Sequence, residues 1–207
     1  MLVKLLRSQV KRLVENNIIL KLIAKLKIPP NFFSFLAVVL ALPGAYFLSQ
    51  GRILISLIFI GPALVWDAID GAYARTAGKT SQFGAYIEGI FDVYVEVIIF
   101  LGLVAWNYSF EASLAMMLSL ILSYAKPRVS QIVSVKDVDW PGMGGKFDRR
   151  LIFFLSLILA YFFPSFDAIG RSFDTMSVLL YLLSAVVFIG GIQRMYFAKK
   201  IIEKGNL

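Results

Sequence analysis

The stretch "WDAIDGAYARTAGKTSQFGAYIEGIFD", residues 66–92, places four carboxylates inside strongly apolar sequence. The four are Asp67, Asp70, Glu88 and Asp92. At about 100° per residue on a helix, Asp67 and Asp70 fall on one narrow face. Glu88 and Asp92 are four residues apart and continue the stripe that Gly84 begins. The stretch predicts two helices joined by a short loop, whose acidic faces meet.

The composition of the whole chain shows how unusual this placement is. Of 207 residues, 59% are hydrophobic and 16% are charged, and the mean hydropathy is +0.78. Such values are typical of a membrane protein. The chain has no cysteine and no histidine, which excludes disulfides, Cys-ligated zinc, a thiol nucleophile and a histidine base. Chemistry in this protein must therefore rest on carboxylates, Lys, Arg, hydroxyls or a metal held by oxygen.

Six apolar stretches are candidates for membrane spans, since about 20 apolar residues cross the hydrocarbon core. They are Phe32–Ser49, Ile53–Ala74, Phe83–Trp106, Ala112–Ala125, Leu151–Pro164 and Ser177–Ala198. The fourth and fifth are short, and we expect both to extend into the polar loop between them. Residues 1–30 show helical spacing of apolar residues and cations, typical of an interfacial amphipathic helix. The sequence predicts an all-α integral membrane protein with this helix at 1–30 and a six-span catalytic domain at 31–207.

Lysine and arginine are distributed unevenly among the connections. The N-terminal segment, the second and fourth connections and the C-terminal tail carry most of them. Because cytoplasmic loops carry the positive excess, both termini and the acidic stretch are predicted to face the cytoplasm of a cell-membrane protein. This asymmetry also explains much of the net charge of +8 without a nucleic-acid partner.

Four carboxylates brought together at membrane depth require protons or cations to neutralise them. Hard oxygen ligands favour Mg²⁺, Mn²⁺ or Ca²⁺ over zinc. Small residues beside the carboxylates leave room for a bulky anion, and Arg75 offers a fixed cation for phosphate oxygens. These small residues are Gly71, Ala74 and Gly84. Metal, small residues and arginine together indicate a bound diphosphate.

The spacing resembles the signature of the CDP-alcohol phosphotransferase family. The match runs Asp67-x-x-Asp70-Gly71-x-x-Ala74-Arg75, then eight residues, then Gly84-x-x-x-Glu88-x-x-x-Asp92. One position departs, because the family has aspartate where this chain has Glu88. The six-span architecture with a leading interfacial helix is similar to the family as well.

The resemblance implies that an acceptor hydroxyl attacks the β-phosphorus of a CDP-linked donor and releases CMP. It assigns metal binding, with two ions of Mg²⁺ or Mn²⁺, to Asp67, Asp70 and Glu88. Asp92 would be the general base and also touch a second metal. The residues implied to line the CDP pocket are Gly71, Ala74, Arg75 and Gly84. Family members are homodimers, so the resemblance also implies a homodimer.

Three cations are candidates for binding a phosphorylated acceptor, by similarity to the branch that makes phosphatidylinositol phosphate or archaetidylinositol phosphate. They are Lys126, Arg150 and Arg194. Lys126 and Arg150 are also explained as loop charges of the positive-inside rule, and Arg194 as a snorkelling side chain. A lone arginine in an apolar span is costly and usually faces a partner or a water-filled cavity.

We therefore expect a phosphatidyl-type group to move from a CDP-linked lipid to inositol 1-phosphate, as a step of phospholipid biosynthesis. Glycerol 3-phosphate is the alternative acceptor, and a soluble CDP-inositol is the alternative donor. A small ion-coupled transporter is the alternative of another class, since clustered intramembrane carboxylates also mark ion pathways. Against a transporter, the acidic residues gather at one end of the spans and no pair of related halves is visible.

Overall fold

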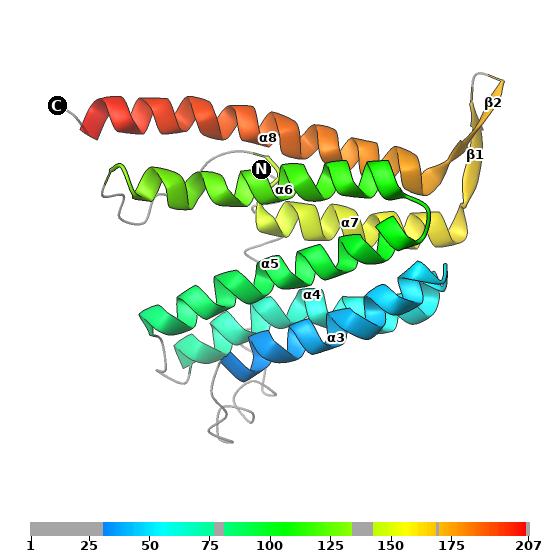
Figure 1. Ribbon diagram of the computed structural model, residues 1–207, viewed down its shortest axis with the longest axis horizontal. Helices are drawn as coiled ribbons and strands as arrows, with labels where there is room; N and C mark the ends of the chain where they lie inside the picture. The colour runs from blue at the N-terminus through cyan, green and yellow to red at the C-terminus, as the bar shows by residue number, and fades with distance from the viewer. Residues whose placement is uncertain (1–30, 77–80, 134–142, 169, 206–207) are drawn as a thin grey trace. The chain divides into compact units, whose positions relative to one another are not determined.

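The computed structural model describes residues 31–76, 81–133, 143–168 and 170–205, with side chains described outside 65–76 and 204–205. The predicted interfacial helix at 1–30 lies outside the described residues. The chain divides into two compact units, residues 1–107 and 108–207. Figure 1 shows that helices dominate both units.

In the described part of the first unit, three helices follow one another in the chain. They are α3 (Asn31–Ser49), α4 (Ile53–Thr76) and α5 (Gln82–Ala105). Helix α3 packs against both α4 and α5, and small residues let the backbones approach. A Cβ at Gly102 would lie 2.7 Å from the carbonyl oxygen of Ala45, and one at Gly44 would lie 2.7 Å from Cγ1 of Ile60. Close backbone approach through small residues is how helices associate where burial of apolar surface gives little driving force.

The described residues of the second unit form three helices and a hairpin. They are α6 (Ser109–Ser130), α7 (Lys146–Phe162), β1 (Ser165–Ala168), β2 (Arg171–Asp174) and α8 (Thr175–Gly205). Helix α8 packs against α6 and α7. The largest fully buried side chains of this unit form its core: Leu122, Leu157, Met176, Leu180, Leu183 and Val187.

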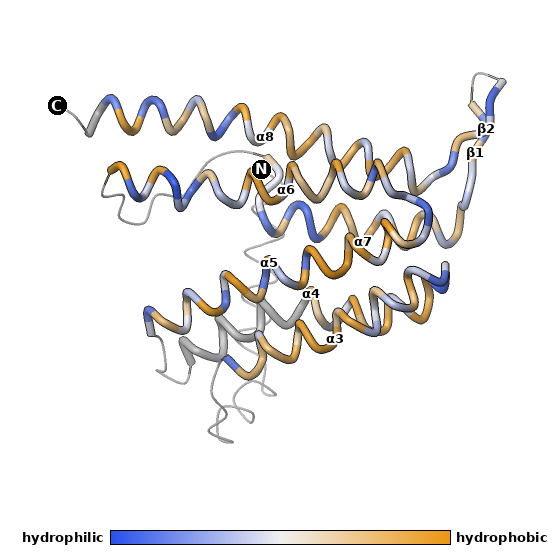
Figure 2. The backbone as a smooth tube through the Cα atoms, viewed as in Figure 1, coloured by the Kyte–Doolittle hydropathy of each residue, from blue (hydrophilic) through white to orange (hydrophobic). Residues whose placement is uncertain are grey.

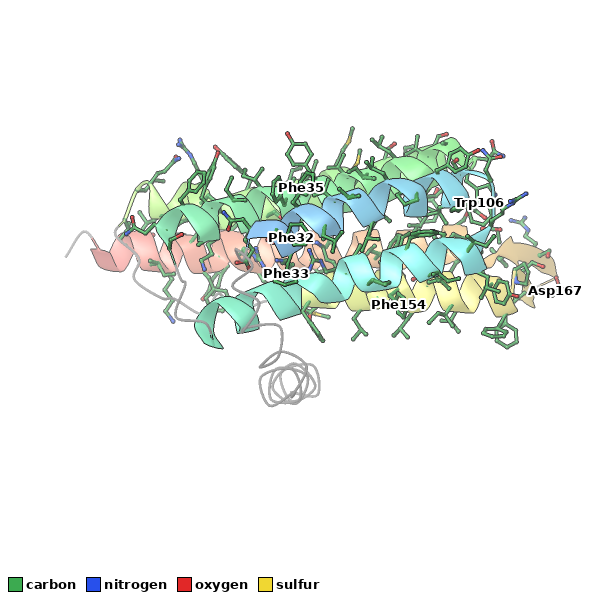
Figure 3. All side chains as sticks on the ribbon, turned by 90° about the horizontal axis from the view of Figure 1, so that it is seen from below. Phe32, Phe33, Phe35, Trp106, Phe154 and Asp167 are labelled. Atoms are coloured by element: carbon green, nitrogen blue, oxygen red, sulfur yellow. The ribbon has the colours of Figure 1, made fainter. Side chains whose placement is uncertain are left out.

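Two helices in the described part of the chain are long and apolar enough to span a membrane, Asn31–Ser49 and Thr175–Glu203. Many of their large apolar side chains point outward. On α3, Phe33 is buried whereas Phe32 and Phe35 are 47% and 53% exposed (Figure 3). Figure 2 shows that polar residues concentrate at the start of α7 and in the last turns of α8. Helices that are apolar on the outside and polar at one end suit a bilayer.

Each of the six predicted apolar stretches lies within or overlaps one of these helices. As expected, the fourth and fifth extend into the polar loop between them, since α6 runs to Ser130 and α7 begins at Lys146. Pro127 lies inside α6, so the helix continues past its missing N–H. That all six helices cross a bilayer remains a prediction.

The hairpin of β1 and β2 was not predicted from the sequence. Phe166 pairs with Phe173 across the antiparallel ladder, and their rings stack with centroids 5.8 Å apart. The Tyr108 hydroxyl, at the start of α6, donates to Oδ2 of Asp174 at 3.2 Å. Burial, followed by the charge of Asp174 and its hydrogen bond, raises the pKa of Tyr108 to about 12. The base of the hairpin is thereby tied to α6.

Candidate functional site

The predicted acidic stripe lies on the first half of α5. Ser81 caps this helix, because its Oγ accepts a hydrogen bond from the backbone N–H of Gly84 at 2.9 Å. A Cβ at Gly84 would lie 3.0 Å from that same oxygen, so glycine suits the tight cap. Glu88 and Asp92 follow at one-turn intervals, and both side chains are half-buried. The stripe therefore places two carboxylates, each with partial shelter from water, one turn apart.

The other half of the predicted site falls on α4, whose last turns contain the remaining signature positions. The side chains predicted there lie outside the described residues: Asp67, Asp70, Gly71, Ala74 and Arg75. Helix α4 ends at Thr76 and α5 begins at Gln82, and the two helices contact each other.

The four carboxylate positions lie at similar distances from the connection between α4 and α5. Asp70 lies six residues before the end of α4, and Glu88 lies six residues after the start of α5, which is about 9 Å along each helix. Asp67 and Asp92 lie nine and ten residues from the same ends, or about 14 Å. Two antiparallel helices joined by a short connection therefore carry their carboxylate positions at matching heights.

The donors that this site offers suit a hard divalent cation. Among the described residues, no group of three or more Asp, Glu, His or Cys side chains could hold a metal ion, since two of the four predicted ligands lie on α4. Glu88 and Asp92 supply carboxylate oxygens, and the chain has no His or Cys to attract a softer metal. Mg²⁺ and Mn²⁺ are bound by such oxygen donors. The available residues fit the predicted ions.

The second unit holds two arginines beside the same stretch of α6. Arg149 is only 5% exposed; its Nη2 donates to Oγ of Ser123 at 2.9 Å and its Nη1 to the carbonyl oxygen of Gly144 at 3.1 Å. Nη1 of Arg194 donates to the carbonyl oxygen of Leu122 at 2.7 Å. The two guanidiniums thus dock on neighbouring residues of one helix.

One arginine of this pair, Arg194, has a buried donor without a partner. Nε of Arg194 is buried and has no hydrogen-bond partner. The charge of Arg149 acts unfavourably on Arg194, and the carboxylate of Asp148 offsets this in part. Asp148 is itself engaged, because it accepts a hydrogen bond from the N–H of Gly145 at 3.1 Å and caps α7. A buried charged donor of this kind is a suitable partner for an anion.

The other two predicted acceptor cations are placed differently. Lys126 is exposed near the end of α6, and Arg150 is half-buried on the first turns of α7. Their roles stay predictions. The structure adds Arg149, which sequence reasoning passed over in favour of its neighbour. A signal was present, because Arg149 shares the buried face of α7 with Phe153, Ser156, Leu157 and Ala160, a spacing of three and four residues.

Comparison with known proteins now gives the family. A sequence model of the CDP-alcohol phosphatidyltransferase family matches residues 27–192. The chain belongs to this family. This chain is 29% identical over 206 residues to the archaetidylinositol phosphate synthase of Pyrococcus horikoshii, covering 97% of this chain and 98% of that protein. It is also 29% identical over 119 residues to the phosphatidylinositol phosphate synthase of Corynebacterium glutamicum, covering 52% and 54%.

The fold agrees with this assignment. A crystal structure of the phosphatidylinositol phosphate synthase of Mycobacterium tuberculosis with CDP-DAG bound matches with a TM-score of 0.73 at 20% identity, covering 90% of this chain and 94% of that one. Another structure of that synthase, in complex with manganese and citrate, has the same TM-score and covers 87% of each chain. The predicted resemblance is confirmed: the phosphatidyltransferase is a transferase of a phospholipid-biosynthetic family.

Proposed function

We propose that this phosphatidyltransferase moves a phosphatidyl-type group from a CDP-linked lipid to inositol 1-phosphate and releases CMP. The observation that carries the choice of acceptor is the arginine pair. Arg149 and Arg194 present two guanidiniums beside Leu122 and Ser123, with one buried donor free. A guanidinium presents a planar fork of donors that matches the oxygens of a phosphate. The names of the Pyrococcus and Corynebacterium relatives also support a phosphorylated inositol as acceptor or product.

The reaction would be one displacement at phosphorus. The acceptor hydroxyl oxygen forms a bond to the β-phosphorus of the donor, the bond between that phosphorus and the bridging oxygen breaks, and CMP leaves. The hydroxyl proton passes to the carboxylate of Asp92, a half-buried group. Phosphoryl transfer asks a protein mainly for positioning and charge neutralisation. Arg149 and Arg194 would hold the acceptor through the phosphate that does not react, joined by Lys126 and Arg150.

Two divalent ions would be held by Asp67, Asp70, Glu88 and Asp92. When bound, they supply neutralisation of the donor diphosphate. Support comes from the oxygen-only donor set and from the manganese in the Mycobacterium structure. Gly71, Ala74, Arg75 and Gly84 would line the CDP pocket. We place the active site at the cytoplasmic face of a chain with six spans, in accordance with the distribution of Lys and Arg. A homodimer is proposed from the family resemblance alone.

The test is CMP release by purified protein in detergent. The donors are CDP-diacylglycerol, CDP-archaeol and CDP-inositol; the acceptors are inositol 1-phosphate, glycerol 3-phosphate, inositol and serine. Each pair is assayed with Mg²⁺, Mn²⁺ or EDTA. We expect metal-dependent release with inositol 1-phosphate and a CDP-lipid. Asp92→Asn should abolish this release, whereas Glu96→Gln, one turn further along α5 and outside the family signature, should retain it.

Each outcome decides one part of the proposal. Release with glycerol 3-phosphate alone would contradict the acceptor, and release with CDP-inositol alone would contradict the lipid donor. Full activity of Asp92→Asn would contradict its role as base. Undiminished release in EDTA would contradict the metal requirement.

A further inference from the structure

A turn before α7 packs directly on the backbone of α8. The N–H of Met143 donates to Oε1 of Gln193 at 2.8 Å. Gly190 lies one turn earlier on α8, and a Cβ there would collide with the carbonyl oxygen of Met143 and lie 2.9 Å from its carbonyl carbon. Any residue larger than glycine at position 190 must therefore push the turn away from the helix.

The middle of the same turn is equally confined. Gly144 is buried and has a φ of +71°, a conformation that favours glycine. A Cβ there would lie 3.2 Å from Cα of Val187 on α8 and 3.3 Å from Cδ2 of Leu122 on α6. The turn is thus wedged against two helices of the second unit.

The position of the turn decides the position of Arg149. The carbonyl oxygen of Gly144 and the hydroxyl of Ser123 both accept hydrogen bonds from the Arg149 guanidinium. Arg194, the residue after Gln193, docks on α6 next to Ser123. Gln193 therefore fixes the turn, the turn fixes Arg149, and the spacing between the two arginines follows.

We propose that Gln193 and Gly190 are positioning residues of the acceptor site. They hold Arg149 at the spacing from Arg194 that a phosphate requires, without touching the substrate themselves. This inference rests on the proposed acceptor. It predicts a loss confined to acceptor affinity, because the two arginines would hold only the acceptor, through the phosphate that does not react. A merely structural role predicts a general loss of stability and activity instead.

Two adjacent glycines allow a matched test. Gly190→Ala puts a methyl group into the turn, whereas Gly191→Ala meets nothing within 4 Å. Both changes replace glycine by alanine in the same helix, so their effects on helix propensity are equal. We expect Gly190→Ala to raise KM for inositol 1-phosphate by about tenfold or more, the size of one lost hydrogen bond from a charged donor, with kcat and KM for CDP-diacylglycerol within about twofold of wild type. Gly191→Ala should match wild type in all three.

Gln193 is tested with a pair of variants as well. Gln193→His, assayed at about pH 8, keeps a neutral side chain with a ring nitrogen that accepts from Met143 and should keep KM for inositol 1-phosphate near the wild-type value. Gln193→Leu has a similar size but no acceptor and should raise this KM as Gly190→Ala does. Thermal unfolding and size-exclusion chromatography in detergent, on all four variants, report whether each is folded.

The outcomes separate this inference from the proposed function. If wild type releases no CMP with inositol 1-phosphate, the proposed acceptor fails and the inference fails with it. If wild type is active but the two glycine variants have equal KM values for the acceptor, only the positioning role is overturned. A Gly190→Ala variant that is folded but loses kcat and donor affinity to the same extent as acceptor affinity would also overturn it.

Discussion

Replacing Arg194 by glutamine should separate stability from acceptor binding. The change removes the positive charge and shortens the side chain, while leaving a polar group on α8. If the arginine only snorkels or ties α8 to α6, the variant should lose stability. If it is held ready for a phosphate, the variant should keep its stability and lose its acceptor.

The expected change in stability is small because two effects oppose each other. The lost hydrogen bond from Nη1 to the Leu122 carbonyl, 2.7 Å long, is worth about 1.5–3 kcal/mol for a charged donor. Against this, the buried Nε has no partner, which costs about 1–3 kcal/mol, and the unfavourable charge of Arg149 on Arg194 also disappears. We expect the free energy of unfolding to stay within about 1 kcal/mol of wild type.

The expected change in acceptor affinity is large. Removing one member of a buried, hydrogen-bonded charge pair costs about 2–5 kcal/mol. Since about 1.4 kcal/mol is tenfold, KM for inositol 1-phosphate should rise at least about thirtyfold. Arg194→Lys keeps the charge without the planar fork and should fall between wild type and Arg194→Gln.

The assay combines thermal unfolding in detergent with initial rates of CMP release at varied acceptor. The control is Arg128→Gln, because Arg128 is exposed on α6 and donates to Gln131 at 2.9 Å. It should change neither quantity. A loss of more than about 2 kcal/mol from Arg194→Gln, the size of the lost bond, together with an unchanged KM would refute the reasoning and leave Arg194 a structural residue.

Three further changes test other parts of the molecule. The pKa of Tyr108 is raised from 10.0 to about 12 in the folded chain. The contribution of Tyr108 to stability is therefore complete below about pH 10 and is lost as the pH rises toward 12. The difference in melting temperature between wild type and Tyr108→Phe should shrink over that range. Gly102→Ala should lower the free energy of unfolding by about 1–3 kcal/mol, since its Cβ would meet the backbone of Ala45, whereas Gly89→Ala, which meets nothing, should not. Glu88→Gln should raise the Mn²⁺ concentration that gives half-maximal CMP release, and an unchanged value would exclude this carboxylate as a ligand.

The helices could be predicted from the sequence because long apolar runs have few other solutions in a bilayer. Their ends were harder. Helix α7 begins with "KFDRR", residues 146–150, which a search for apolar runs passes over. Asp148 starts it by accepting a hydrogen bond from Gly145, a local capping signal that the sequence carries. Polar first turns are therefore missed when hydropathy alone sets the boundary.

The hairpin was missed for a different reason. Its ten residues, "SFDAIGRSFD", alternate Phe with Ser and Asp around Gly170, whose φ is +71°. This is a recognisable strand and turn pattern, but it follows directly on the apolar stretch Leu151–Pro164, which is predicted to be a membrane span. Two-stranded hairpins have little stability alone, and the bond from Tyr108 to Asp174 that supports this one joins residues 66 positions apart.

The site, too, has some features that follow from local sequence and others that depend on contacts between distant residues. The spacing of Glu88 and Asp92 on one face is a property of any α-helix, so the acidic stripe could be predicted. The choice between Arg149 and Arg150 required the phase of α7. The contact of Gly190 with Met143 required the tertiary structure, because nothing in "IGGIQRM", residues 189–195, distinguishes the glycine that meets the turn from the one that meets nothing.

Gln193 and Arg194 are adjacent in the sequence, yet they differ in how fully their side chains are hydrogen-bonded. The neutral amide of Gln193 has its oxygen bonded to a backbone N–H, as expected of a group whose task is complete within the chain. Arg194 also binds a backbone group but keeps a buried donor without a partner beside a second positive charge. A neutral side chain would join α8 to α6 without that cost. An anion that accepts from Nε would offset this cost, which is why we propose binding for Arg194 and positioning for its neighbour.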